Sequence, residues 1–156
     1  MATLLEQSKN LEKLSEKVIV EQMFQAIRQA EKKIIELNKF QLSLGENREG
    51  SKNTNYASTT ENFWRYEDPP YNNYFFDYKK TSNPYNFEWS GELLKGLKLE
   101  VSDELATIYS TNTNGGKDFY VVKEKAFGLN DENLKLIIQT KVIPFINKFA
   151  RATLKI

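Results

Sequence analysis

The amino-acid sequence predicts an α+β fold: an N-terminal helix or helix pair, a long aromatic-rich loop, a small antiparallel sheet and a C-terminal helix packed on the sheet. Three observations give this prediction. Apolar residues recur at steps of three and four over residues 4–43 and again over 130–153, which is the spacing of one helix face. Apolar and charged residues alternate over residues 97–101, which is the period of a strand. Residues 45–89, between these regions, have no helical period.

The first helical region opens with a capping box, in which the Thr3 hydroxyl caps the helix and Glu6 reaches back. Gly45 suits a C-terminal stop. We predict either one helix over residues 4–43 or two helices that break near residues 15–18. The strongest apolar stripe consists of Val20, Met23, Phe24, Ile27, Ala30, Ile34, Leu37 and Gln41. This region is longer than a small sheet can cover, so its remaining apolar face is available to a neighbouring subunit.

The segment over residues 45–89 is predicted to be a loop with an aromatic insert. Residues 45–62 are rich in turn formers and lack periodicity. Twelve of the twenty aromatic residues of the chain fall within residues 56–89, among Asn, Thr and Pro. Short extended pieces are predicted at 74–78 and 85–89.

Residues 90–128 are predicted to form the small antiparallel sheet. Leu97, Leu99 and Val101 alternate with charged residues and define its first strand. The predicted order is a helical turn over 90–96, a strand over 97–101, a turn over 102–104, a returning strand over 105–111, a loop over 112–116 and a short third strand over 119–122.

The C-terminal helix is predicted over residues 130–153, with Asn130 or Asp131 as its N-cap. Pro144 lies inside the helical pattern and lacks a backbone donor, so we expect a kink or a restart there. No linker or repeat interrupts the chain, and we expect one domain over residues 1–156. The apolar face consists of Leu134, Ile137, Ile138, Val142, Phe145, Ile146 and Phe149.

The composition bounds the possible functions. The formal net charge is +1, with Lys and Arg mixed among Asp and Glu, whereas binding of a polyanion draws on clustered positive charge. There is no His and no Cys, which excludes disulfides, thiolate metal sites and the common nucleophile–base pairs. The lack of Cys fits a cytosolic origin. We expect no membrane span and no signal peptide.

Each catalytic pattern has a simpler structural interpretation. Ser90 with Lys95 is a conceivable nucleophile–base pair, but a serine that caps a turn is favoured. Glu88 and Glu92 are the pair of acids that would suit glycoside hydrolysis, and they are the weaker hypothesis. Residues 114–117 read Asn-Gly-Gly-Lys but lack the pattern of a phosphate-binding loop, so a hairpin turn is preferred. We predict no catalytic residue, cofactor or metal ion.

The aromatic insert is the candidate interaction site. Some of its rings are expected to complete the core. Others are expected to form a protein–protein surface, where Tyr, Trp and Phe are the enriched anchors. A third interpretation is a stacking platform for single-stranded nucleic acid or glycans, because Arg65, Lys79 and Lys80 alternate with the rings, although nearby acids offset that charge. The predicted interface residues are Trp64, Tyr66, Tyr71, Tyr74, Phe75, Phe76, Tyr78 and Trp89.

The order of these features resembles a family of small virion proteins of tailed bacteriophages and prophages, especially those of Bacteroidetes. These look like the neck or tail-completion proteins of long-tailed phages. The resemblance covers about residues 34–135 and is carried by segments 34–50, 78–80, 89–97, 108–111 and 127–133. A small residue followed by Gly opens a short element before the first long strand in that family, and Ser90-Gly91 fits this place. Trp89 and the Tyr-rich insert before it depart from the pattern.

The resemblance implies a structural virion protein with no enzymatic activity. Such a subunit would sit in a homo-oligomeric ring at the head–tail connection, the neck, or at the tail terminus. Its partners would be further copies of itself and the portal, adaptor or tail-tube subunits, in a virion assembled in the host cytoplasm. The alternative function is an aromatic platform that binds single-stranded nucleic acid or glycan.

Overall fold

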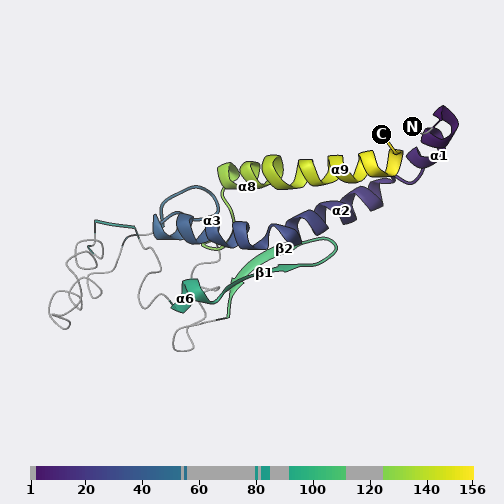
Figure 1. Ribbon diagram of the computed structural model, residues 1–156. Helices are drawn as coiled ribbons and strands as arrows, with labels where there is room; N and C mark the ends of the chain where they lie inside the picture. Colours follow the sequence, from purple (N-terminus) through teal and green to yellow (C-terminus); the bar gives the residue numbers. More distant parts are fainter. Residues whose placement is uncertain (1–2, 54, 56–79, 81, 85–91, 112–124) are drawn as a thin grey trace.

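The computed structural model describes residues 3–53, 55, 80, 82–84, 92–111 and 125–156 (Figure 1). The α+β class is confirmed. The chain begins with helices α1 (Leu4–Leu11), α2 (Glu16–Gln29) and α3 (Glu31–Ser43). A single-turn helix α6 (Glu92–Lys95) precedes strands β1 (Leu97–Val101) and β2 (Ala106–Ser110). The C-terminal helical region consists of α8 (Asp131–Ile137), a π-helical turn η2 (Ile138–Val142) and α9 (Ile143–Leu154).

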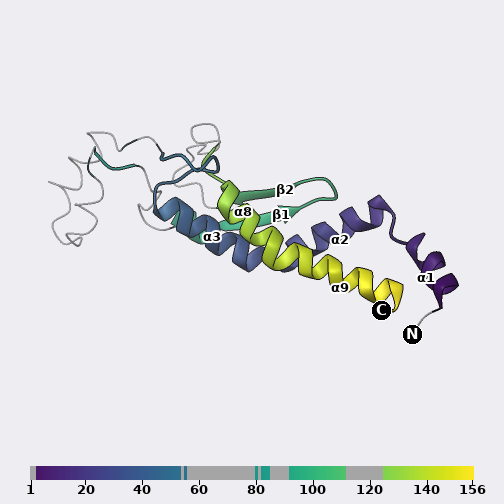
Figure 2. The ribbon, with the colours of Figure 1, turned by 90° about the horizontal axis from the view of Figure 1, so that it is seen from above.

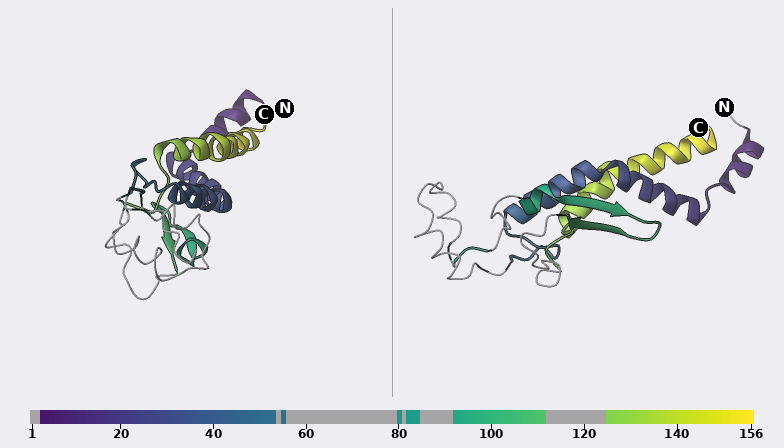
Figure 3. Two further views of the ribbon diagram at one scale, coloured as in Figure 1. Left: turned by 90° about the vertical axis from the view of Figure 1, so that its left-hand side faces the viewer. Right: turned by 90° about the horizontal axis from the view of Figure 1, so that it is seen from below.

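The described elements form three layers. Helices α2 and α3 lie in the middle, with α9 on one side and the β1–β2 hairpin on the other (Figures 1 and 3). The prediction that the C-terminal helix packs on the sheet is therefore wrong for α9, which packs on α2 instead. The molecule is elongated, because α1 and the end of α9 extend past the hairpin (Figure 2). We call α1, the start of α2 and α9, residues 4–23 and 143–156, the helical arm.

The N-terminal region contains three helices rather than one or two. The predicted capping box is confirmed: the Glu6 N–H donates to Thr3 Oγ1 at 3.3 Å, and the Glu6 carboxylate accepts from the Thr3 N–H at 2.8 Å. These hydrogen bonds lower the pKa of Glu6. The predicted break is also confirmed, since Ser15 caps α2. A second break at Ala30 was not predicted, because Ala favours helix and the apolar stripe continues through it.

The hairpin has the predicted strands, and its sheet contains two strands within the described residues. The register pairs Leu97 with Ser110 and Val101 with Ala106. Arg28 fixes the hairpin tip to α2, because its guanidinium donates to the Val101 carbonyl at 3.1 Å and lies 3.7 Å from the Asp103 carboxylate. The predicted third strand and the extended pieces at 74–78 and 85–89 lie outside the described residues.

The C-terminal helical region begins at the predicted cap, where the Asn130 side chain accepts a hydrogen bond from the Asn133 N–H at 3.0 Å. A kink or a restart was predicted at Pro144, and the structure shows a π turn there, within a helical region that runs without a break from α8 to α9. Pro144 lies in the first turn of α9, directly after the π turn. Pro144 has no backbone N–H to donate to the preceding turn. The loss of helix stability is small here, because the wider π turn before it changes which carbonyl lies opposite the proline nitrogen.

The core lies where α3, the hairpin and α8 meet. Its buried hydrophobic residues are Ala26, Ala30, Ile34, Leu42, Leu93, Leu97, Ile108, Ala126, Phe127, Ile137 and Val142. The helical arm is different: no residue of α9 is fully buried, and Asn10 is the one buried residue of α1. Large apolar side chains of the arm, Leu4, Leu5, Leu11, Met23 and Ile156 among them, face solvent. The arm therefore contributes no fully buried hydrophobic residue to the core, although Phe145 and Ile146 of α9 pack against it.

Gly45 ends α3 as predicted, with a φ of +71°. The Gly45 N–H donates to the Leu42 carbonyl at 2.9 Å, and the Glu46 N–H donates to the Gln41 carbonyl at 3.0 Å. This pair of bonds is a Schellman motif, and it satisfies two of the last carbonyls of the helix. A Cβ atom added at Gly45 would lie 2.7 Å from Pro84 Cγ.

We predict that Gly45→Ala lowers the free energy of unfolding by about 2–3 kcal/mol, because it adds both a left-handed alanine and a clash with Pro84. Gly50→Ala is the matched control, since Gly50 has a φ of +74° and the nearest atom to an added Cβ is 3.9 Å away. That control should lose about 1 kcal/mol from backbone strain alone. Urea denaturation measures both, and equal losses would show that the contact with Pro84 contributes nothing.

Candidate assembly interface

The eight aromatic residues predicted to form the interface lie outside the described residues, at positions 64–78 and 89. The same is true of Ser90, Glu88 and the loop at 114–117. None of these predicted sites therefore lies wholly within the described residues. The described residues instead show an apolar groove that the sequence did not reveal.

The groove lies between the middle helix layer, β2 and α8, and its volume is about 550 Å³. Ile27 of α2 and Ile34 of α3 line the groove from the side of the helix layer. The remaining lining residues are Arg48, Leu99, Leu105, Ala106, Thr107, Ile108, Phe127, Gly128, Leu129, Leu134, Ile137, Ile138 and Val142. Arg48 is the one charged residue among them, so the lining is apolar almost throughout.

The rim of the groove consists of large apolar side chains that water reaches. Leu105 is 63% exposed, Leu134 is 47% exposed and Ile138 is 40% exposed. Clustered apolar residues at a surface mark places where another molecule binds, because burying them is favourable. A groove of this kind suits insertion of an apolar side chain from a protein partner. Helical periodicity identified Leu134 and Ile138 as apolar-face residues, but it did not show that they remain at the surface.

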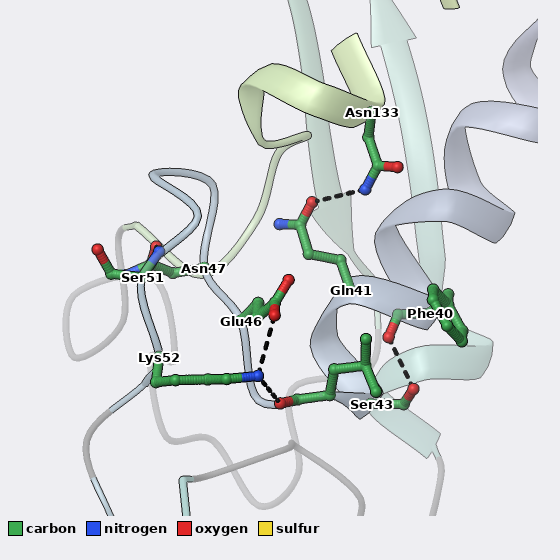
Figure 4. Close-up of polar contacts among 9 residues, drawn as sticks. Phe40, Gln41, Ser43, Glu46, Asn47, Ser51, Lys52 and Asn133 are labelled. Carbon is green, nitrogen blue, oxygen red and sulfur yellow. Dashed lines mark hydrogen bonds and ion pairs between the residues drawn. The ribbon is translucent and has the colours of Figure 1, made fainter. Parts of the chain in front are cut away.

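The α8 wall of the groove is held in place by Gln41, which is 1% exposed. Its Nε2 atom donates to the Gly128 carbonyl at 2.9 Å. Its Oε1 atom accepts from the Asn130 N–H at 2.9 Å. The same atom accepts from Asn133 Nδ2 at 3.2 Å (Figure 4). Asn38 adds a second donor to the Gly128 carbonyl, at 2.7 Å. Gln41, the last residue of the apolar stripe, thus connects α3 to the start of α8.

The loop after α3 supports the same junction. Lys52 Nζ lies 2.9 Å from the Glu46 carboxylate and also donates to the Leu44 carbonyl at 3.0 Å (Figure 4). These contacts close the loop on itself. The Arg48 N–H then donates to the Lys125 carbonyl at 2.9 Å, which joins the loop to the segment before α8. A Cβ atom at Gly128 would lie 3.1 Å from Arg48 Cβ, so a glycine is needed for this approach.

Three of the described acids have structural roles. Asp131 and Glu132 lie in the first turn of α8, where the helix dipole favours negative charge. Asp103 faces Arg28, and its side chain is 97% exposed. Within the described ranges, no three side chains of His, Cys, Asp or Glu gather as they would around a metal ion.

Over the same part of the chain, none of the helices has the length and apolar character that a membrane span requires. Comparisons of the sequence with known protein families and with curated proteins, and of the fold with solved structures, find no match. The candidate interface therefore rests on the sequence and on the geometry of this structure.

We predict that Gln41→Leu lowers the free energy of unfolding by about 1–3 kcal/mol, because the part-buried Asn130 N–H loses its acceptor. Amide hydrogen exchange at residues 130–133 should also accelerate, since the start of α8 loosens. Unchanged stability and exchange would contradict the role assigned to Gln41.

Gln41→Glu is the companion variant. Its carboxylate can accept from Asn130 but cannot donate to the Gly128 carbonyl, and burial raises the pKa of such a group. Because the pKa of the introduced carboxyl in the folded variant would be raised, the loss of stability relative to the unsubstituted protein is largest at neutral pH. The loss becomes smaller as the pH falls through the folded-state pKa. Chemical denaturation across pH, compared with the unsubstituted protein, measures this recovery.

Proposed function

We propose that this chain is a structural virion protein, a subunit of a ring at the head–tail connection, or neck, or at the tail terminus of a tailed phage. The observation that carries the proposal is the apolar groove with its exposed rim, together with a helical arm whose apolar residues are uncovered in the single chain. A ring subunit needs surfaces of this kind, because it buries them on its neighbours.

The order of sequence features supports the same assignment. The Ser90-Gly91 step precedes α6 and β1, and the Phe127-Gly128 step precedes α8. In the neck and tail-completion proteins that this chain resembles, a step ending in Gly precedes the first long strand. A Phe-Gly-Leu segment precedes the last helix.

The proposed mechanism is assembly by shape and burial, without turnover and without a cofactor. The groove would accept an apolar group from a partner, and the arm would pack against an adjacent copy. The partners are further copies of this chain and the portal, adaptor or tail-tube subunits. Assembly takes place in the host cytoplasm, and the finished protein resides in the virion.

Quantitative mass spectrometry of purified phage or induced-prophage particles tests the proposal directly. We expect a small fixed number of copies per particle, far below the copy number of the major capsid protein, because one ring forms at one vertex. Absence of the protein from particles would overturn the proposal.

We predict that Leu134→Lys reduces incorporation into particles at least tenfold. A charge placed at the rim of an interface loses the burial of the leucine and must be desolvated, which costs about 1.4 kcal/mol or more. Leu136→Lys is the matched control, because Leu136 lies on the same helix at 41% exposure but does not line the groove. Particle incorporation by complementation, with circular dichroism to check folding, compares the two. Equal incorporation would show that the groove is not an assembly surface.

A further inference from the structure

The solvent face of the C-terminal helix carries unopposed positive charge. Glu132 is the last acidic residue, and five basic residues follow it. Lys141, Lys148 and Arg151 are all exposed. A step of three residues places Lys148 and Arg151 on one side of α9, and Lys141 lies in η2, directly before this helix. None of the three forms an ion pair with another residue that the structure describes. We call them the basic face.

The hairpin tip carries the opposite charge. Glu100, Asp103 and Glu104 are exposed there, and Arg28 compensates Asp103 alone. Lys98 lies further along the outward face of β1, away from the tip. Among the described residues, Glu100 and Glu104 have no ion-pair partner. We call the three acids the acidic tip.

The basic face and the acidic tip belong to opposite sides of the molecule. Helix α9 and the hairpin flank the middle layer of α2 and α3 from its two sides (Figures 1 and 3). The two surfaces of one copy therefore cannot meet each other, whereas those of two copies can. Three positive charges would then face the acidic tip, in which Glu100 and Glu104 are not compensated by another described residue.

We propose that the occupant of the basic face is the acidic tip of a second copy of this chain, in a head-to-tail contact. Two different surfaces of the same chain form such a contact, so each copy keeps one surface free and further copies can add until a ring closes. A two-fold dimer through either surface would instead place like charges together, which is unfavourable. The inference rests on the proposed ring function and names the surfaces that would join its subunits.

Charge reversal tests the contact in the full-length protein. The first variant is Lys148→Glu with Arg151→Glu, and the second is Glu100→Lys with Glu104→Lys, which leaves the Arg28–Asp103 contact intact. All four side chains are exposed, so both variants should fold normally. The control, Lys32→Glu with Lys33→Glu, makes the same change of net charge as the first variant, on exposed residues of α3 that lie outside both surfaces and outside the helical arm.

Sedimentation velocity at low salt should show self-association of the unsubstituted protein and of the control. Each reversal variant alone should associate about tenfold more weakly or worse, because attraction becomes repulsion at two charge pairs. An equimolar mixture of the two variants should restore association, since the acidic helix of one then meets the basic tip of the other. Association should weaken at about 1 M salt, where the Debye length is about 3 Å.

Several outcomes would overturn the inference: a monomeric unsubstituted protein, reversal variants that associate normally, or a mixture that fails to associate. Binding of a labelled DNA duplex that requires Lys148 and Arg151, without self-association, would assign the basic face to nucleic acid instead. The ring function is tested separately by particle composition. If the protein is present in particles and the reversal variants incorporate normally, the inference fails while the ring function stands.

Discussion

The buried Gln41 side chain fixes the start of α8, and through α8 it sets the shape of the apolar groove. One amide group donates to the Gly128 carbonyl, which it shares with Asn38, and accepts from the part-buried Asn130 N–H. An unsatisfied polar group in a core is costly, so the segment before α8 has one stable position relative to α3. The groove walls on the two sides of this junction, Ile34 and Ile137 among them, therefore keep a constant separation.

The elements whose signals are local could be predicted from the sequence. The Thr3 cap, the stop at Gly45, the β1–β2 strands, the Asn130 cap and an irregularity near Pro144 each depend on residues within a few positions. The break at Ala30 could not be predicted, because alanine is the residue that best tolerates a continuous helix there.

The groove could not be predicted either, for a different reason. Its walls come from residues 27, 105 and 134, which are distant in sequence, and periodicity shows that a residue is apolar without showing what covers it. Leu134 and Ile138 were expected to be packed on the sheet, yet both remain at the rim. Gln41 was assigned to the apolar stripe by its spacing, and its hydrogen bonds across 87 to 92 positions are invisible to any local pattern. The predicted aromatic interface stays a prediction.

The π turn η2 has a consequence for the orientation of everything that follows it. A π turn is equivalent to an α-helix into which one residue has been inserted, and one residue corresponds to about 100° of rotation. The extra residue therefore sets how far the side of α9 that packs on α2 is rotated relative to the side of α8 that lines the groove. A single-residue change in length between Ile138 and Val142 would turn the whole of α9 about its axis, with both its apolar stripe and its charges, while leaving α8 where it is. The number of residues in η2 therefore sets the rotation of α9 relative to α8.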